Sequence, residues 1–353
     1  MSLPFLQSYL GLSNSLQTAQ GSATPPIPTR GVFGGGSIVT SSNVIDYVTI
    51  ATTGNAIDFG DLTVSRHYIA SCASATRGVF AGGYTVALSN VIDYVTIATT
   101  GNATDFGDLS VTRMIVAGCA SATRGLFAGG HAGGASNVID YVTIATPSNA
   151  TDFGDLTVAR WGIGACASET RGLFGGGYAT SVDSNVIDYV TIATTGNAID
   201  FGDLTVARYG LAGCASSTRG LVAGGAAVNV IDYVTIATTG NATDFGDLTV
   251  TRYQLAGCAS STRGLFGGGD TYNVIDYVTI ATTGNATDFG DLTVARGRFA
   301  GCASSTRGLF GGGLFSGGNS NVIDYVTIAT TGNATDFGDL TVTRSYVGGC
   351  AGS

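Results

Sequence analysis

The sequence contains no lysine, and charged residues of all kinds make up only 11% of its 353 residues. The formal net charge is −9 at neutral pH. Binding to a phosphate backbone depends on clustered cations that release counterions, so this balance argues against a nucleic-acid partner. No apolar run approaches the length of a transmembrane helix, and we therefore expect no insertion into a membrane. The N-terminus lacks the cationic flank of a signal peptide, so we expect a soluble protein that no cleaved leader exports.

Histidine is also scarce, because the chain has only His67 and His131, and these belong to different repeat units. No Cys/His or Ser/His/Asp spacing suggests a metal centre or an activated nucleophile. The Gly-rich stretch RGLFGGG is not followed by the lysine that a phosphate-binding loop requires. We therefore predict no catalytic residue, no bound metal and no cofactor, and a protein that is not an enzyme.

Charged helix formers are rare as well, since lysine is absent and glutamate occurs once, whereas glycine reaches 55 residues and hydrophobic residues 44%. This composition favours an all-β fold. The seven cysteines recur at one equivalent position of an apolar stretch, and an odd number cannot all pair within the chain. We interpret them as small buried hydrophobic side chains. They are Cys72, Cys119, Cys166, Cys214, Cys258, Cys302 and Cys350.

An internal repeat dominates the rest of the chain. The ten residues NVIDYVTIAT occur seven times, starting at Asn43, Asn90, Asn137, Asn185, Asn229, Asn273 and Asn321. A fixed period overrides length as a guide to domain number. We therefore predict one closed array over residues 29–353, preceded by a separate segment over residues 1–28.

One unit shows what the repeat builds. Four short β-prone runs, at residues 253–259, 262–268, 273–282 and 286–294, are separated by Gly, Asn, Asp or Ser. The third run carries apolar side chains on both faces, as a strand covered on both sides requires. A four-stranded sheet packed between two copies of itself is a propeller blade. The sequence thus predicts a seven-bladed β-propeller of antiparallel four-stranded blades.

The order of the runs predicts how the ring closes. The chain enters the array at a second strand, from Thr29, and ends on a first strand, over residues 345–351. The last strand can therefore complete the first blade, which would remove an open sheet edge.

The unit resembles the Kelch-type β-propellers. The similarity lies in an apolar run that ends in a double glycine (Gly35, Gly36), a tyrosine on the next strand (Tyr47) and a later aromatic residue, Phe59, where that family usually has Trp. Some members of the family are copper oxidases, but their ligand histidines and tyrosines have no counterpart here. The repeated phrase itself is similar to those of virion or tail-fibre proteins of tailed cyanobacterial phages.

Two sets of charged residues recur in every unit. Asp46 and its equivalents lie in the middle of a strand, where an unpaired carboxylate would be costly, and the repeated arginines, Arg30 and Arg66 in the first unit, offer partners. We predict a ring of structural Asp–Arg pairs. The motif N-A-x-D-F-G-D around Asp58 and Asp61 lacks the dense oxygen ligands of a calcium loop, so a turn followed by a strand is favoured.

The units differ from one another in only two places. The segment between the double glycine and NVIDY varies in sequence and length. The three residues after the Arg that ends the fourth strand vary in sequence. The connection CAS-x-TRG and the turn TTGNA hardly change. Because strands alternate in direction across a blade, one rim should vary and the opposite rim should repeat.

Loops on a rigid scaffold often carry recognition, and aromatic residues and Arg dominate binding hot spots. Relaxed constraint after recent duplication would produce the same variation, so both explanations stay open. The candidate ligand-binding residues in the variable loops are His67, Tyr68, Tyr84, Trp161, Tyr178, Tyr209, Tyr253, Tyr272, Arg298, Phe315 and Tyr346, with His131 and Asp270 beside them.

Residues 1–28 contain Leu3, Leu6 and Leu10 at helical spacing, followed by the linker-like GSATPPIPT. This segment could dock the propeller onto other virion proteins or fold back on the ring. The sequence leads us to expect a binding or structural component of a phage virion, assembled in the bacterial host cytoplasm, that recognises a host-surface glycan or protein. The alternatives are a purely structural decoration or assembly protein, and a Kelch-like enzyme.

Overall fold

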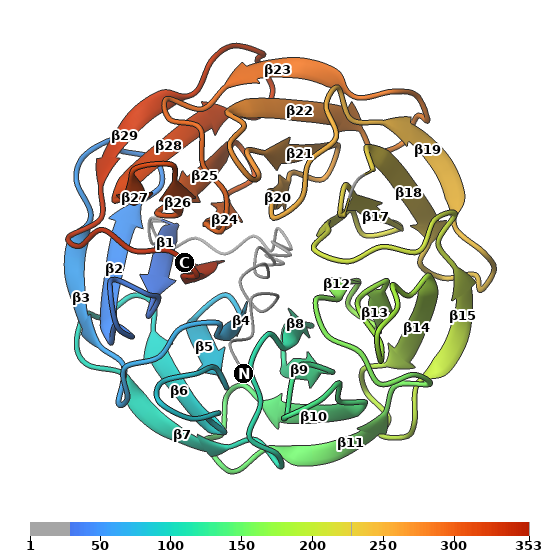
Figure 1. Cartoon of the computed structure of the whole chain (residues 1–353). Helices are drawn as coiled ribbons and strands as arrows, with labels where there is room; N and C mark the ends of the chain where they lie inside the picture. Colours follow the sequence, from blue (N-terminus) through green and yellow to red (C-terminus); the bar gives the residue numbers. More distant parts are fainter. Residues whose placement is uncertain (1–28, 227, 353) are drawn as a thin grey trace, which may run out of the picture.

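A computed structural model describes residues 29–226 and 228–352, and these form a seven-bladed β-propeller. Seven four-stranded antiparallel sheets stand around a central axis (Figure 1). The predicted fold is therefore confirmed. The predicted N-terminal docking segment, residues 1–28, lies outside the described residues.

Each blade is built from an innermost, a second, a third and an outermost strand, in sequence order in every blade but the first. The innermost strands are β4 (Ala70–Ala73), β8 (Ala117–Ala120), β12 (Gly164–Ala167), β16 (Ala212–Ala215), β20 (Ala256–Ala259), β24 (Ala300–Ala303) and β30 (Gly348–Gly352). The second strands are β1 (Arg30–Gly34), β5 (Arg77–Ala81), β9 (Arg124–Ala128), β13 (Arg171–Gly175), β17 (Arg219–Ala223), β21 (Arg263–Gly267) and β25 (Arg307–Gly311).

The third strands carry the repeated phrase and the outermost strands follow it. The third strands are β2 (Val44–Thr49), β6 (Val91–Thr96), β10 (Val138–Thr143), β14 (Val186–Thr191), β18 (Val230–Thr235), β22 (Val274–Thr279) and β28 (Val322–Thr327). The outermost strands are β3 (Ile57–Asp61), β7 (Thr104–Asp108), β11 (Thr151–Asp155), β15 (Ile199–Asp203), β19 (Thr243–Asp247), β23 (Thr287–Asp291) and β29 (Thr335–Asp339). A two-stranded hairpin, β26 (Leu314–Phe315) and β27 (Gly318–Asn319), extends one connection.

All four predicted strands extend beyond the observed ones, and for the innermost and outermost strands the difference falls mainly at the end nearest the variable stretches. The innermost strand predicted at residues 253–259 begins only at Ala256, because Gln254 has a positive φ of 60° that no strand accommodates. The outermost strand predicted at residues 286–294 covers Thr287–Asp291. The shorter strands leave longer connections on the rim where the sequence varies.

The core lies between neighbouring sheets. One apolar cluster, for example, joins Ile45 and Phe59 of the first blade to Phe80 and Val95 of the second. All seven cysteines are buried and free in this layer, which confirms their interpretation as apolar side chains. Burial raises the pKa of the Cys166 thiol to about 12. A Cβ added at Gly125 would lie 2.7 Å from the Sγ of Cys72 in the preceding blade, so the glycine makes room for the thiol.

A buried ion pair joins every blade to the next. The Arg that follows the outermost strand of one blade reaches the Asp of the third strand in the following blade, and both side chains are at most 1% exposed. The N–O distances are 2.5–2.8 Å in Arg66–Asp93, Arg113–Asp140, Arg160–Asp188, Arg208–Asp232, Arg252–Asp276, Arg296–Asp324 and Arg344–Asp46. The predicted ring of pairs is confirmed, with the partner always in the neighbouring blade.

The other repeated arginine has a different role. The guanidinium of Arg30 lies 4.4 Å from the ring centroid of Tyr47 in its own blade. It also donates a 2.8 Å hydrogen bond to the carbonyl of Ile97 in the next blade. The Tyr47 ring in turn meets Phe59 edge to face at 5.7 Å. This stack recurs in all seven blades and holds the second, third and outermost strands together.

The chain ends close the ring as predicted. Strand β30 pairs antiparallel with β1, with Cys350 opposite Val32, and so becomes the innermost strand of the first blade. The ion pair Arg344–Asp46 spans the same junction. Sequence-distant ends therefore share both a strand ladder and a buried charge pair.

Deletion of residues 348–352 should lower the melting temperature and broaden the unfolding transition. The deletion leaves β1 as an unpaired edge, and such an edge also promotes aggregation. Calorimetry and light scattering measure both effects. A truncated chain that melts as sharply and as high as the full one would contradict closure by β30.

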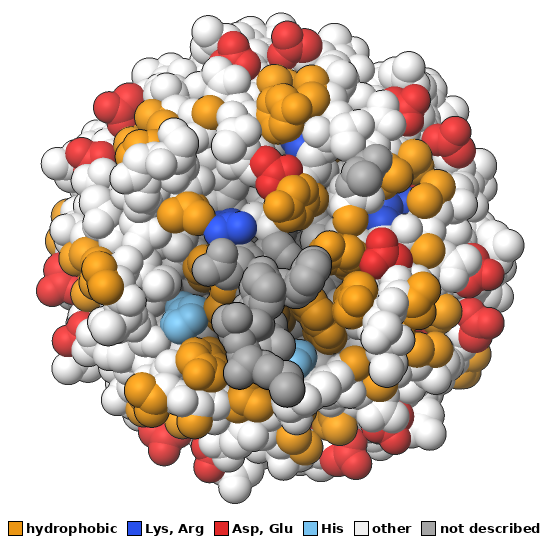
Figure 2. All heavy atoms as spheres, viewed as in Figure 1, with side chains coloured by type: hydrophobic (Ala, Val, Ile, Leu, Met, Phe, Trp, Pro, Cys, Tyr) orange, Lys and Arg blue, Asp and Glu red, His pale blue; other side chains and the backbone are white. Residues whose placement is uncertain are grey.

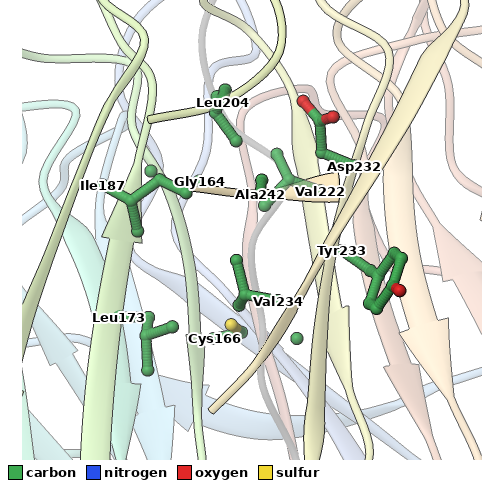
Figure 3. Close-up of a pocket in the computed structure, with 12 residues that line it drawn as sticks. Gly164, Cys166, Leu173, Ile187, Leu204, Val222, Asp232, Tyr233, Val234 and Ala242 are labelled. Carbon is green, nitrogen blue, oxygen red and sulfur yellow. The ribbon is translucent and has the colours of Figure 1, made fainter. Parts of the chain in front are cut away.

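One blade interface contains a small cavity. Six blades carry a buried Phe near the end of the second strand, whereas the fifth carries Val222. Next to Val222 lies Gly175 of the fourth blade, and a cavity of about 10 Å³ remains between the two sheets (Figure 3). A space of this size holds at most about one water molecule, so it is a packing defect and not a ligand site.

We expect Val222→Phe to stabilise the propeller by roughly 1–2 kcal/mol, because it fills the cavity with the side chain that fits the other blades. The matched control is Phe174→Val, which should create a similar defect one interface earlier and cost about 1–3 kcal/mol. Denaturant unfolding of both variants gives the two changes. A Val222→Phe variant less stable than the parent would show that the interface has relaxed around the smaller residue.

Candidate ligand-binding site

The two variable stretches lie side by side on one rim of the ring. Backbone bridges join the residues after the outermost strand to the connection between the second and third strands, as in His67–Tyr84, Met114–His131 and Trp161–Tyr178. We call this rim, made of residues 37–42 and 67–69 and their equivalents, the variable face. The predicted asymmetry between the two rims is thus present in the structure.

The opposite rim is tied into the ring by its own backbone. The amides of Gly101 and Ala103 donate to the carbonyls of Phe59 and Asp61 in the preceding blade, at 2.7 and 2.8 Å. The side chain of Asn102 accepts a 3.1 Å bond from the amide of Asp61. These residues belong to the turn TTGNA, which therefore joins two blades. This contact is a physical reason for the nearly constant sequence of the turn.

Seven residues of the variable face share a left-handed backbone conformation. They are the middle residues of the variable triplets, with φ between 56° and 68°: Tyr68, Ile115, Gly162, Gly210, Gln254, Arg298 and Tyr346. We call this set the axial ring. Left-handed φ is uncommon for residues other than glycine, and most of all for a β-branched residue such as Ile115. Strain of this kind clusters at functional sites.

Hydrogen bonds between blades hold the axial ring in place. The amide of Gln254 donates to the carbonyl of Gly210 at 3.0 Å, Arg298 donates to Gln254 at 3.2 Å, and Tyr346 donates to Arg298 at 2.9 Å. The innermost strand of each blade begins two residues further on. The axial ring thus presents successive side chains around the mouth of the central axis.

An aromatic group fills one part of the axial ring. The rings of Tyr68 and Tyr346 lie 4.3 Å apart, and His67 lies 4.7 Å from Tyr68 and 5.6 Å from Tyr84. The Nδ1 of His67 is 2.9 Å from the hydroxyl of Ser41. Burial lowers the pKa of His67 to about 4, so its imidazole is neutral at pH 7. These side chains are packed against one another and form a rigid surface.

A second aromatic group stands where the axial ring has no side chains. Trp161 lies 5.2 Å from Tyr178 and 6.4 Å from Tyr209, and the two tyrosines are 5.5 Å apart. Gly162 and Gly210 follow Trp161 and Tyr209 directly. We call Trp161, Tyr178 and Tyr209 the aromatic shelf. Hydrophobic side chains are spread over this face, and acidic ones lie mostly toward its edge (Figure 2).

A polar group completes the ring. The Nε of Arg298 donates a 2.6 Å hydrogen bond to the Oε1 of Gln254, and the guanidinium lies 5.3 Å from the ring centroid of Tyr346. The amide of Tyr253 donates a long bond of 3.5 Å to Asp270. Desolvation by burial raises the pKa of Asp270 above its ordinary value.

The predicted site residues therefore fall into three neighbouring groups and two outliers. Tyr272, which is 39% exposed, and Phe315, on the β26–β27 hairpin, do not belong to the apolar cluster at the axis. Met114, Ile115 and Gln254, which are not among the predicted site residues, are buried in or beside the axial ring. They also lie in the variable triplets, and this position is the signal that could have identified them.

The N-A-x-D-F-G-D motif has a structural role. The Oδ1 of Asp58 accepts a 3.0 Å bond from the amide of Gly60, and the asparagine binds the neighbouring blade as described above. No group of three or more His, Cys, Asp and Glu side chains that could hold a metal ion occurs within residues 29–226 and 228–352. The same part of the chain contains no helix that is long and apolar enough to cross a membrane.

No protein-family model matches this sequence, and a search of curated proteins gave no significant match. The assignment to the β-propellers therefore rests on the geometry of the seven blades.

We expect the C2 proton of His67 to titrate near pH 4 in nuclear magnetic resonance spectra, whereas a free imidazole titrates near 6.5. The unfolded chain binds the proton first as pH falls, so stability should decrease between pH 6.5 and 4. The loss should amount to roughly 1–2 kcal/mol, allowing for partial exposure. His67→Gln should remove this part of the pH dependence. An ordinary titration near 6.5 would show that the imidazole is solvated.

Proposed function

We propose that this propeller is a non-enzymatic binding module, and that it recognises a ligand on a host cell surface through the variable face. The observation that carries the proposal is the concentration of variation and aromatic side chains on one rim of an otherwise repeated ring. Tyr and Trp offer large rigid contact areas with a polar tip, which suits saccharides and protein surfaces.

Exposed apolar residues at the loop tips support the same proposal. Val39 is 95% exposed, Val86 is 91% exposed and Val182 is 61% exposed, and all three lie in the connections of the variable face. Solvent-exposed apolar side chains that gather on one face are typical of interaction surfaces. A partner that covers this face would remove them from water.

The proposed setting is a phage virion or tail fibre. It rests on the resemblance of the repeated phrase NVIDYVTIAT to such proteins, and the Kelch-type similarity of the unit adds no chemistry to it. Within this proposal, residues 1–28 connect the propeller to other virion proteins. A purely structural role in the particle is the competing possibility.

The double variant Tyr178→Ala and Tyr209→Ala should reduce attachment of the labelled protein to cyanobacterial cells at least about tenfold, because two shelf anchors are lost. Both tyrosines are only partly buried, so the melting temperature should change little. The matched control is Thr195→Ala with Thr239→Ala, two exposed residues on the opposite rim of the same blades. Flow cytometry measures attachment. Equal attachment of the parent and the shelf variant would remove the recognition proposal and leave the structural role.

A further inference from the structure

Arg298 stands apart from the other arginines of the protein. Of the fifteen, seven pair with aspartates between blades and seven stack on tyrosines within blades. Arg298 belongs to neither set and lies in the axial ring of the variable face. No carboxylate of the described residues is within ion-pair distance of it. In a protein of net charge −9, a cation at the mouth of the axis is a local exception.

The side chain of Gln254 lies beside Arg298, and its amide nitrogen Nε2 makes no hydrogen bond among the described residues. The Oε1 of Gln254 accepts the 2.6 Å bond from Arg298, so the amide nitrogen is the group left to make another contact. The side chain is 3% exposed, and its Nε2 has no hydrogen-bond partner among the described residues. A buried donor without an acceptor costs free energy. An acceptor supplied by a ligand would recover that cost.

The donor pair adjoins the aromatic shelf. Gln254 is hydrogen-bonded through its backbone to Gly210, the residue after Tyr209. Gly162 and Gly210, the axial-ring residues that directly follow Trp161 and Tyr209, have no side chains. The axial ring therefore combines two or more hydrogen-bond donors, one of them cationic, with a neighbouring apolar surface.

We propose that the axial ring binds a saccharide that carries a carboxylate. The carboxylate accepts hydrogen bonds from the guanidinium of Arg298 and the Nε2 of Gln254, and an apolar sugar face packs on the aromatic shelf. Arginine forms short, strong hydrogen bonds with carboxylates, and aromatic side chains pack against the apolar faces of polar ligands. This inference deepens the proposed function and rests on it.

Trp161 makes the site directly observable, since it is the one tryptophan of the chain. Its fluorescence is followed while the full chain is titrated with trigalacturonate or with the neutral galactotriose. We expect trigalacturonate to bind at least about tenfold more tightly. This preference should shrink as salt rises from about 0.05 to 0.5 M, because salt screens the charged contact.

Arg298→Gln should abolish the preference while the weaker binding of galactotriose persists. Gln is accepted at this ring position with positive φ, as Gln254 itself shows, so the variant should fold, and its melting temperature checks this. Gln254→Leu should also weaken trigalacturonate binding. Equal affinities for the two sugars, no fluorescence change with either, or a preference that survives Arg298→Gln would each overturn the inference.

The same measurements separate this inference from the proposed function. If cells are captured through Tyr178 and Tyr209 but trigalacturonate is not preferred, the acidic-sugar site is wrong and host recognition stands. If trigalacturonate is preferred but cells are not captured, the acidic-sugar site stands and host recognition is wrong.

Discussion

The structure depends above all on the buried pair of an arginine and an aspartate between neighbouring blades. Each carboxylate lies in the middle of a third strand with no access to water, where an uncompensated charge would be very costly. In the pair Arg66–Asp93, the carboxylate also accepts a 2.6 Å bond from the hydroxyl of Thr63. The guanidinium donates in addition to carbonyls of Phe80 and Gly82. One arginine thus connects two strands of the next blade to its own.

This pair explains why so much of the sequence is repeated. Every blade contributes the aspartate to one interface and the arginine to the other, so a change in either residue leaves a buried charge without its partner. Burial lowers the pKa of Arg160 to about 10, and its guanidinium is therefore still charged at neutral pH. The same logic holds for the glycine that accommodates the neighbouring thiol and for the turn that binds the preceding outermost strand. On the variable face the backbone makes most of the links between blades, so the side chains there can vary.

The variable positions meet at the axis on one side of the ring. At each of these positions one residue has a left-handed backbone and is hydrogen-bonded to its neighbours, and the seven residues in the circle are Tyr, Ile, Gly, Gly, Gln, Arg and Tyr. Tyrosines occupy one part, two glycines stand beside the aromatic shelf, and a donor pair separates them. The seven blades therefore form a constant scaffold, and the residues of the axial ring differ from blade to blade. Such a scaffold can acquire a new ligand preference without altering the contacts that hold the blades together.

Much of the fold follows from the sequence alone. The sevenfold phrase, the apolar character of both faces of its strand and the order of the first and last runs determine the number of blades and the closure by β30. The need of Asp46 and its equivalents for a cationic partner follows from their mid-strand position. The variable rim follows from the alternating direction of the strands. All of these are local or periodic properties, so they can be read without knowing which residues meet in space.

The tertiary structure decided the rest. Which of two repeated arginines meets the aspartate depends on how far a side chain reaches across the interface, and the partner comes from the neighbouring blade. The axial ring and the pairing of Arg298 with Gln254 arise from residues about 44 or more positions apart that closure brings together. Sequence comparison marks these positions as variable. Only the packing of seven blades around one axis makes them a single site, because adjacency there is set by the ring and not by the chain.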